Sequence, residues 1–304
     1  MKTIFLTTLF SFLVTLSAFS QYTEGKLQRP DGVLYYYETG KGKPLLLLPS
    51  GPGFSHDYTR RMADSLKTEF RCIMIDLRGT GKSRWAKYDS TTMKFSLMID
   101  DVEALRKQLN LPKLAILGHY FGGQLAMAYA ARFPQNVETM VLVASGGVNN
   151  AYQSYFGLNL QTRLRPEDSE RIRYWGDSKL AAQDRPKSDI ERVKTMVNAY
   201  VSNRTLASKV TDNYKAGDFN SQVSNVVGID KGYTQMDLSP AMQKYEGRAI
   251  IIAGRQDPLG EAVPISLRQS IKGAELIFIN RCGHYPWIEY PNVFYKYLRD
   301  FLRK

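Results

Sequence analysis

The stretch from Lys113 to Phe133 decides the fold: Lys-Leu-Ala-Ile-Leu-Gly-His-Tyr-Phe-Gly-Gly-Gln-Leu-Ala-Met-Ala-Tyr-Ala-Ala-Arg-Phe. Its first part, Lys113 to Gly118, is a short apolar run that predicts a buried strand. Its last part, Gly122 to Phe133, is rich in small residues and predicts a helix that the following proline ends. Tyr120 therefore lies in the turn just after a strand, where the ligands of open α/β sheets bind.

Similar apolar runs recur on both sides of this stretch. They predict strands at residues 33–39, 44–49, 71–76, 139–144, 248–253 and 274–279, and amphipathic stretches predict helices at 58–69, 96–109 and 292–302. Strands without polar alternation are buried on both faces, and strands that alternate with helices form a parallel sheet. The chain is therefore predicted to be an α/β protein, with a sheet covered by helices on both faces.

The composition is globular, because 43% of the 304 residues are hydrophobic and 23% are charged. A net charge of +12 makes a polyanion partner worth testing. The basic residues are scattered among acids and no aromatic-rich binding motif is present, so we expect no nucleic-acid partner. With 2 cysteines and 3 histidines, we expect no metal site and no cofactor, and Cys72 and Cys282 are predicted to be free thiols.

The N-terminus has the pattern of a secretory signal peptide over residues 1–20. Lys2 supplies the positive charge, and the apolar run from Ile4 to Phe19 is shorter than the ~20 residues that span a bilayer. Ala18 and Ser20 flank Phe19 as small residues before the expected cleavage site at Gln21. We therefore expect an exported protein, periplasmic or secreted, with no membrane span after cleavage; the alternative is an uncleaved anchor.

The alternation of strands and helices breaks between Gly147 and Gly247. This segment is rich in Arg, Lys, Tyr and Asn, and contains helical stretches such as Ile190 to Asn203. We predict a core at residues 21–147 and 247–304 with a helical cap at 148–246. Aromatic residues of the cap are expected to form its own core rather than a wall of a site; they are Tyr152, Tyr155, Phe156, Tyr174 and Trp175.

The turn at Gly118 to Gly122 resembles the nucleophile elbow of α/β-hydrolases, in which a strand, Gly-x-Ser-x-Gly and a helix follow one another. Tyr120 stands where the serine belongs. The loop from Gly254 to Pro258 resembles the family's acid loop, and the loop from Cys282 to Glu289 resembles its histidine loop, in the family's order. The resemblance is to the prolyl aminopeptidase (proline iminopeptidase) and esterase-like branch. It implies a mostly parallel eight-stranded sheet with a helical cap.

The resemblance also implies the site residues. Tyr120, Asp257 and His284 take the three catalytic positions, and the backbone N–H groups of Gly51 and Phe121 form the oxyanion hole. In the loop that contains Gly51, Pro49 and Ser50 replace the usual His-Gly of the family. The implied substrate is a small molecule or a short peptide with an ester, amide or N-terminal aminoacyl bond.

Tyr120 is the departure from the family pattern. The elbow projects a short side chain, so a phenol oxygen would overshoot the oxyanion donors and the histidine. Three interpretations stay open. The chain is a serine hydrolase variant that has lost most activity, or a pseudoenzyme that binds a small molecule or partner, or a protein in which Tyr120 acts as a nucleophile or in proton transfer.

Four other polar residues lie near the predicted strand ends or the loops that follow them. Ser50 and Ser145 are expected to be turn residues, because neither lies in an elbow. His119 is expected to point away from the site and to be structural. His56 follows the oxyanion loop and is a candidate for lining the pocket.

Overall fold

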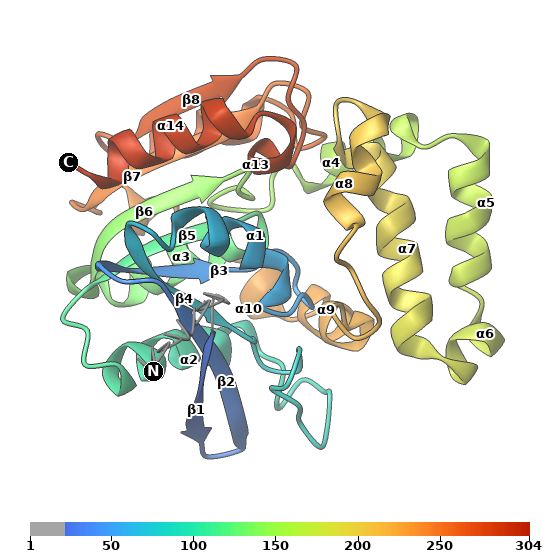
Figure 1. Ribbon diagram of the computed structural model, residues 1–304, viewed down its shortest axis with the longest axis horizontal. Coiled ribbons are helices and arrows are strands. Elements are labelled where there is room, and N and C mark those ends of the chain that lie inside the picture. The colour runs from blue at the N-terminus through green and yellow to red at the C-terminus, as the bar shows by residue number, and fades with distance from the viewer. Residues whose placement is uncertain (1–21) are drawn as a thin grey trace, which may run out of the picture.

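The structure is a computed structural model that describes residues 22–304 (Figure 1). The expected signal peptide and its cleavage site lie outside these residues. A single eight-stranded sheet runs through the described part, in the order β1-β2-β4-β3-β5-β6-β7-β8. This is the mostly parallel sheet that the sequence predicts.

The parallel strands are β3 (Lys43–Leu48), β4 (Phe70–Ile75), β5 (Leu114–His119), β6 (Val137–Val143), β7 (Arg248–Gly254) and β8 (Glu275–Ile279). They coincide with the predicted apolar runs within two residues. β2 (Gly32–Thr39) pairs antiparallel with both β4 and β1 (Thr23–Arg29). The sequence reasoning missed β1, because Leu27 is the only buried residue of this edge strand and no apolar run marks it.

Helices cover both faces of the sheet, and the side chains of β3 pack alternately on one face and the other. Leu45 and Leu47 pack on one face with α1 (Asp57–Leu66) and α14 (Pro291–Leu302). Leu46 and Leu48 pack on the other face with the helices α2 (Phe95–Gln108), α3 (Phe121–Arg132) and α12 (Ala262–Ser270). Successive side chains of a strand point to opposite faces, so the four consecutive leucines of β3 contribute to two cores at once.

The chain between β6 and β7 is helical. It forms α4 (Gln153–Arg163), α5 (Pro166–Trp175), α6 (Ser178–Gln183), α7 (Arg185–Tyr200), α8 (Ala207–Thr211), α9 (Ser221–Gly228), α10 (Lys231–Thr234) and α11 (Ser239–Met242). Figure 1 shows α4 to α9 beside the sheet, on the side toward which the arrows of β3 and β6 point. These helices therefore face the carboxyl edge of the parallel strands. Among residues 22–304, no helix is both long and apolar enough to cross a membrane.

Candidate active site

Tyr120 occupies a sharp turn between β5 and α3. Its backbone has φ 47° and ψ −105°, a conformation that costs a non-glycine residue free energy. The flanking glycines permit the turn: a Cβ on Gly118 would lie 2.3 Å from the carbonyl oxygen of Gly122, and a Cβ on Gly122 would lie 2.4 Å from that of Leu48. The strained turn aims the Tyr120 side chain beyond the carboxyl edge of the sheet.

Two loops at the same edge bring Asp257 and His284 together. Asp257 follows β7, His284 follows β8, and Nδ1 of His284 lies 2.8 Å from Oδ2 of Asp257. Both residues are buried, and the second Asp257 oxygen accepts the backbone N–H of Leu259 at 2.9 Å. Because a carboxylate only accepts, Nδ1 carries a proton in this contact, and Nε2 is left without a partner among the described residues.

His119 and Tyr200 hold the histidine loop in place. The backbone N–H of His284 donates to the carbonyl of Tyr200 at 3.0 Å, and Nε2 of His119 lies 2.9 Å from the carbonyl oxygen of His284. Since a carbonyl only accepts, Nε2 of His119 is protonated and its Nδ1 accepts from the Tyr58 hydroxyl at 2.9 Å. Burial lowers the pKa of His119 well below its usual value. The prediction that His119 is structural is confirmed.

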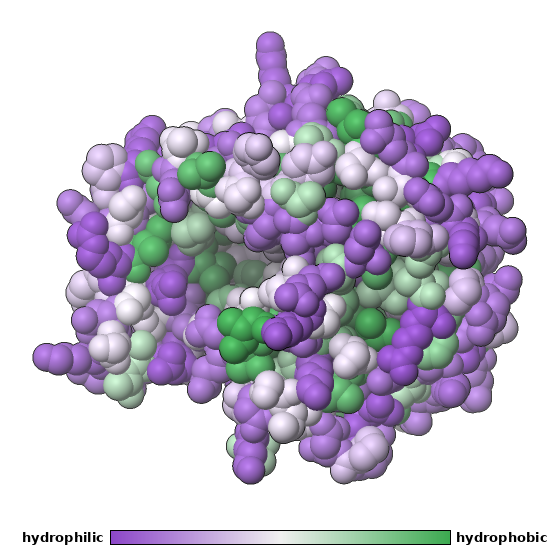
Figure 2. Space-filling view, turned by 180° about the vertical axis from the view of Figure 1, so that it is seen from behind, coloured by the Kyte–Doolittle hydropathy of each residue, from purple (hydrophilic) through white to green (hydrophobic). Residues whose placement is uncertain are grey.

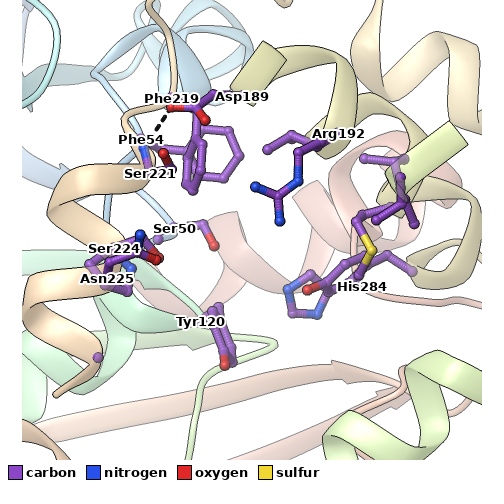
Figure 3. A pocket seen from close by; sticks show the side chains of 18 of the residues that line it. Ser50, Phe54, Tyr120, Asp189, Arg192, Phe219, Ser221, Ser224, Asn225 and His284 are labelled. Carbon is purple, nitrogen blue, oxygen red and sulfur yellow. Dashed lines mark hydrogen bonds between the residues drawn. The ribbon is translucent and has the colours of Figure 1, made fainter. Parts of the chain in front are cut away.

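The phenol of Tyr120 is close to His284 without being paired to it. The two rings meet edge to face with centroids 5.5 Å apart. Figure 3 shows the Tyr120 hydroxyl directed away from the imidazole, and no hydrogen bond joins these two groups within the described chain. Burial raises the pKa of the phenol, and a hydrogen bond with the Gln153 side chain acts against that rise. The phenol therefore stays protonated and is not activated by the histidine.

The two predicted oxyanion donors lie at this edge as well. Gly51 is in the loop after β3, with φ +140° and no room for a Cβ, which would lie 2.6 Å from the nitrogen of Gly53. Phe121 is the first residue of α3, so its N–H has no acceptor within the helix. The backbone thus leaves a donor next to the elbow. Its catalytic role stays a prediction.

A cavity of about 440 Å³ opens between the sheet edge and the helical insertion, within the size range of small-ligand sites. Figure 2 shows a hollow with hydrophobic surface inside it, and Figure 3 shows several of the lining side chains. The cavity is lined by Ser50, Gly51, Pro52, Phe54, Tyr120, Gln153, Ile172, Asp189, Arg192, Val193, Met196, Val197, Tyr200, Phe219, Ser221, Ser224, Asn225, Gly228, Tyr233, His284 and Tyr285. Of the predicted site residues, Gly51, Tyr120 and His284 thus face one space, while Asp257 and Phe121 lie behind it.

Residues 43–291 match the family model of the alpha/beta hydrolase fold. The chain belongs to the alpha/beta hydrolase family. It is similar to a proline iminopeptidase of Saccharolobus solfataricus, with 23% identity over 96% of this chain and 96% of the relative. That likeness agrees with the branch that the sequence motifs indicate.

The chain is also similar to a second curated relative and to a solved structure. A 2-hydroxy-6-oxononadienedioate/2-hydroxy-6-oxononatrienedioate hydrolase of Escherichia coli O81 is 25% identical over 89% of this chain and 91% of the relative. The solved structure of an alpha/beta fold family hydrolase from Bacillus anthracis str. Sterne has a TM-score of 0.75 at 18% identity, over 92% of this chain and 99% of that one. At this identity the solved structure supports the hydrolase fold and nothing finer.

The helical insertion of this alpha/beta hydrolase family member lines the cavity with residues that sequence reasoning did not single out, among them Gln153, Arg192 and Tyr200. They lie on helices, where no strand end marks a position as facing the site. The five insertion aromatics named from the sequence do not line the cavity. Phe156 is buried in the insertion, as expected, but Tyr155 and Tyr174 are 62% and 60% exposed, so the prediction of a cap core is wrong for these two.

His56 does not line the cavity, so its candidacy as a pocket residue is wrong. Its ring stacks on Tyr37 with centroids 3.6 Å apart, and Nδ1 lies 2.8 Å from Oδ1 of Asp76. Ser145 is a turn residue, as predicted, and its hydroxyl donates to the carbonyl of Gly146 at 2.9 Å. Ser50 belongs to the cavity wall.

Both cysteines lie in the interior of the described chain. Cys72 and Cys282 are free and buried, as predicted, and burial raises the pKa of the Cys72 thiol to about 12. Among residues 22–304, no group of three His, Cys, Asp or Glu side chains could hold a metal ion.

Proposed function

We propose that this hydrolase-family protein holds a small ester, amide or aminoacyl compound in the cavity beside His284, and that Tyr120 replaces the family's nucleophilic serine. Acyl transfer by the chain with Tyr120 is then weak or absent. The observation that carries the proposal is the position of the Tyr120 hydroxyl, which is directed away from the His284 imidazole.

A hydroxyl nucleophile needs a base within about 2.6–3.2 Å to take its proton. The phenol of Tyr120 lacks that contact, and its pKa is raised rather than lowered. Its ring also fills space in front of His284 where an acyl group would lie. A misplacement of about 1 Å can cost about a hundredfold in rate, so the phenol is poorly placed for attack.

The remaining parts of an acyl-transfer site are present around the cavity. His284 offers an unpaired Nε2 and is oriented by Asp257, and Gly51 and Phe121 offer backbone donors. One oxyanion donor is typically worth about 3 kcal/mol in the transition state. The likeness to a proline iminopeptidase supports aminoacyl compounds within this ligand class.

The test compares the wild type with Tyr120→Ser and Tyr120→Phe on aryl esters and aminoacyl anilides. We expect Tyr120→Ser to hydrolyse at least one class about a hundredfold faster than the wild type, because a serine hydroxyl reaches both the base and the oxyanion donors. The wild type and Tyr120→Phe should then be equally slow.

A second candidate function is catalysis by Tyr120 itself, which its contact with the His284 ring keeps open. It predicts the reverse result: a wild-type rate that Tyr120→Phe abolishes. That outcome would overturn the proposal. A Tyr120→Ser protein that folds but hydrolyses nothing would also contradict it, since the rest of the site would not be complete.

We further propose that the protein is exported, on the N-terminal pattern of a positive residue, an apolar run and small residues before Gln21. The mature chain should begin at Gln21 and be found in the periplasm or the medium. N-terminal sequencing of the protein from fractionated cells measures this. An intact N-terminus in the cytoplasmic or membrane fraction would disprove it.

A further inference from the structure

We infer that the ligand of this cavity carries a carboxylate, which Arg192 binds, rather than a free N-terminal ammonium. The inference rests on the proposed function, because it names the ligand class of the same cavity. It is drawn from the charges of the lining residues and from the partners that each charge has.

Arg192 is the only lysine or arginine among the described residues that line the cavity. Figure 3 shows its side chain extending from α7 into the space that Ser50, Tyr120 and His284 also face. Within residues 22–304 its guanidinium has neither an ion pair nor a hydrogen bond. Arg171 and Arg204, by contrast, pair with Glu191 and Asp168.

Asp189, the acidic residue of the cavity wall, does not neutralise this charge. It lies one turn before Arg192 on α7, a spacing at which opposite charges often pair. Its Oδ2 instead accepts the backbone N–H of Ser221 at 2.9 Å, at the first residue of α9, and the residue is only 4% exposed. A carboxylate at a helix N-terminus is stabilised there by the free N–H groups and the helix dipole.

The cavity is therefore left with an unpaired cation. A guanidinium binds a carboxylate through two parallel N–H···O hydrogen bonds, and it repels an ammonium group. The rest of the wall suits the carbon skeleton of such an acid, with Phe54, Phe219 and Tyr233 as apolar surface. The ligand that fits is a small acid whose second carbonyl group reaches His284.

The test measures binding to the wild-type protein by calorimetry. The probes are the monoanilides of succinic, glutaric and adipic acid, the methyl ester of each, and prolyl anilide. We expect at least one acid to bind about tenfold more tightly than its methyl ester and than prolyl anilide, because charge-assisted hydrogen bonds exceed neutral ones.

Two variants assign that preference to one residue. Arg192→Gln should abolish it without loss of folding, since the residue is exposed and unpaired. Arg171→Gln is the matched control: it removes the same charge from a neighbouring helix, outside the cavity wall, and should keep the preference. A thermal melt of each variant confirms that it folds.

The possible outcomes distinguish a failure of carboxylate binding by Arg192 from a failure of ligand binding in the cavity. If acids and methyl esters bind equally, if prolyl anilide binds best, or if Arg192→Gln keeps the preference, the inference is wrong while ligand binding in the cavity stands. If no anilide of any charge binds, the proposed function fails, and the inference fails with it.

Discussion

The described part of the chain contains two buried histidine–aspartate pairs with the same nitrogen–oxygen distance. In one, Nδ1 of His284 lies 2.8 Å from a carboxylate oxygen of Asp257; in the other, Nδ1 of His56 lies 2.8 Å from a carboxylate oxygen of Asp76. All four residues follow strands of the parallel sheet. Distance and burial do not tell the two pairs apart.

The pairs differ in what surrounds them. Asp76 also accepts from the backbone N–H groups of His56 and Lys82, each at 2.8 Å. Nε2 of His56 lies 3.3 Å from the Arg60 guanidinium. Nε2 of His284 has no such partner in the described chain, and His284 lines the cavity. The pair at His284 thus differs from the pair at His56 by a ring nitrogen without a partner and by the cavity in front of it, and these two features make it the candidate for catalysis.

The largest predicted difference between the two pairs is the effect on kcat of replacing their histidines. In a Tyr120→Ser background, His284→Ala should lower kcat by about 10,000-fold or more, because it removes the general base. His56→Ala in the same background should leave kcat of the folded protein within about threefold, and lower its stability by about 1–3 kcal/mol through the lost hydrogen bonds.

The measurement is steady-state kinetics together with urea unfolding of both variants. Equal losses of kcat in the two variants would mean that the pair at His56 takes part in the chemistry, and the distinction between the pairs would be lost. The unmodified Tyr120→Ser protein is the control for both numbers.

Replacing the two aspartates should give a smaller difference in kcat between the two pairs. In the Tyr120→Ser background, Asp257→Asn should lower kcat by about 1,000- to 10,000-fold, since the imidazole loses the partner that fixes its tautomer. Asp76→Asn should leave kcat nearly unchanged and cost about 1.5–3 kcal/mol of stability, because this carboxylate accepts several hydrogen bonds. A midpoint of urea unfolding that Asp76→Asn does not shift would contradict the structural role.

The third histidine gives the smallest predicted effect, in the pH dependence of stability. Burial holds the pKa of His119 well below that of the unfolded chain, about 6.5, so acid protonates the unfolded state first. Stability from this residue is complete above pH 6.5 and is lost as the pH falls, by up to about 1.4 kcal/mol per pH unit.

His119→Gln should remove this slope, because an amide can still donate to the His284 carbonyl and accept from Tyr58 without titrating. Urea unfolding at pH 7 and pH 5.5 measures this slope, with the wild-type protein as the control. An unchanged slope in the variant would show that His119 is not the group that takes up the proton.

The strand ends made much of the site predictable from the sequence. Tyr120, Asp257 and His284 each follow an apolar run, and the edge of a parallel sheet gathers such positions. The same rule also pointed to His56, and there it misled. Whether a residue after a strand faces a cavity depends on its neighbours, here Tyr37 and Arg60, which no local pattern reveals.

The cavity wall was predictable only as a helical segment. Arg192 and Asp189 lie on one face of α7, and the sequence shows two opposite charges at a spacing that favours pairing. They do not pair in the structure, because the backbone N–H of Ser221, which is distant in sequence, donates to the Asp189 carboxylate. Long-range contacts of this kind decide which charge is left free, and they lie beyond what helical periodicity can tell.

The strands that bracket the helical insertion are neighbours in the sheet, with Val141 of β6 opposite Ile250 of β7. The helical insertion therefore leaves the sheet and returns to it at two adjacent strands. Every residue at the elbow, the acid loop and the histidine loop lies outside that excursion. The helical insertion can therefore be replaced by another segment with little change to the positions of Tyr120, Asp257 and His284.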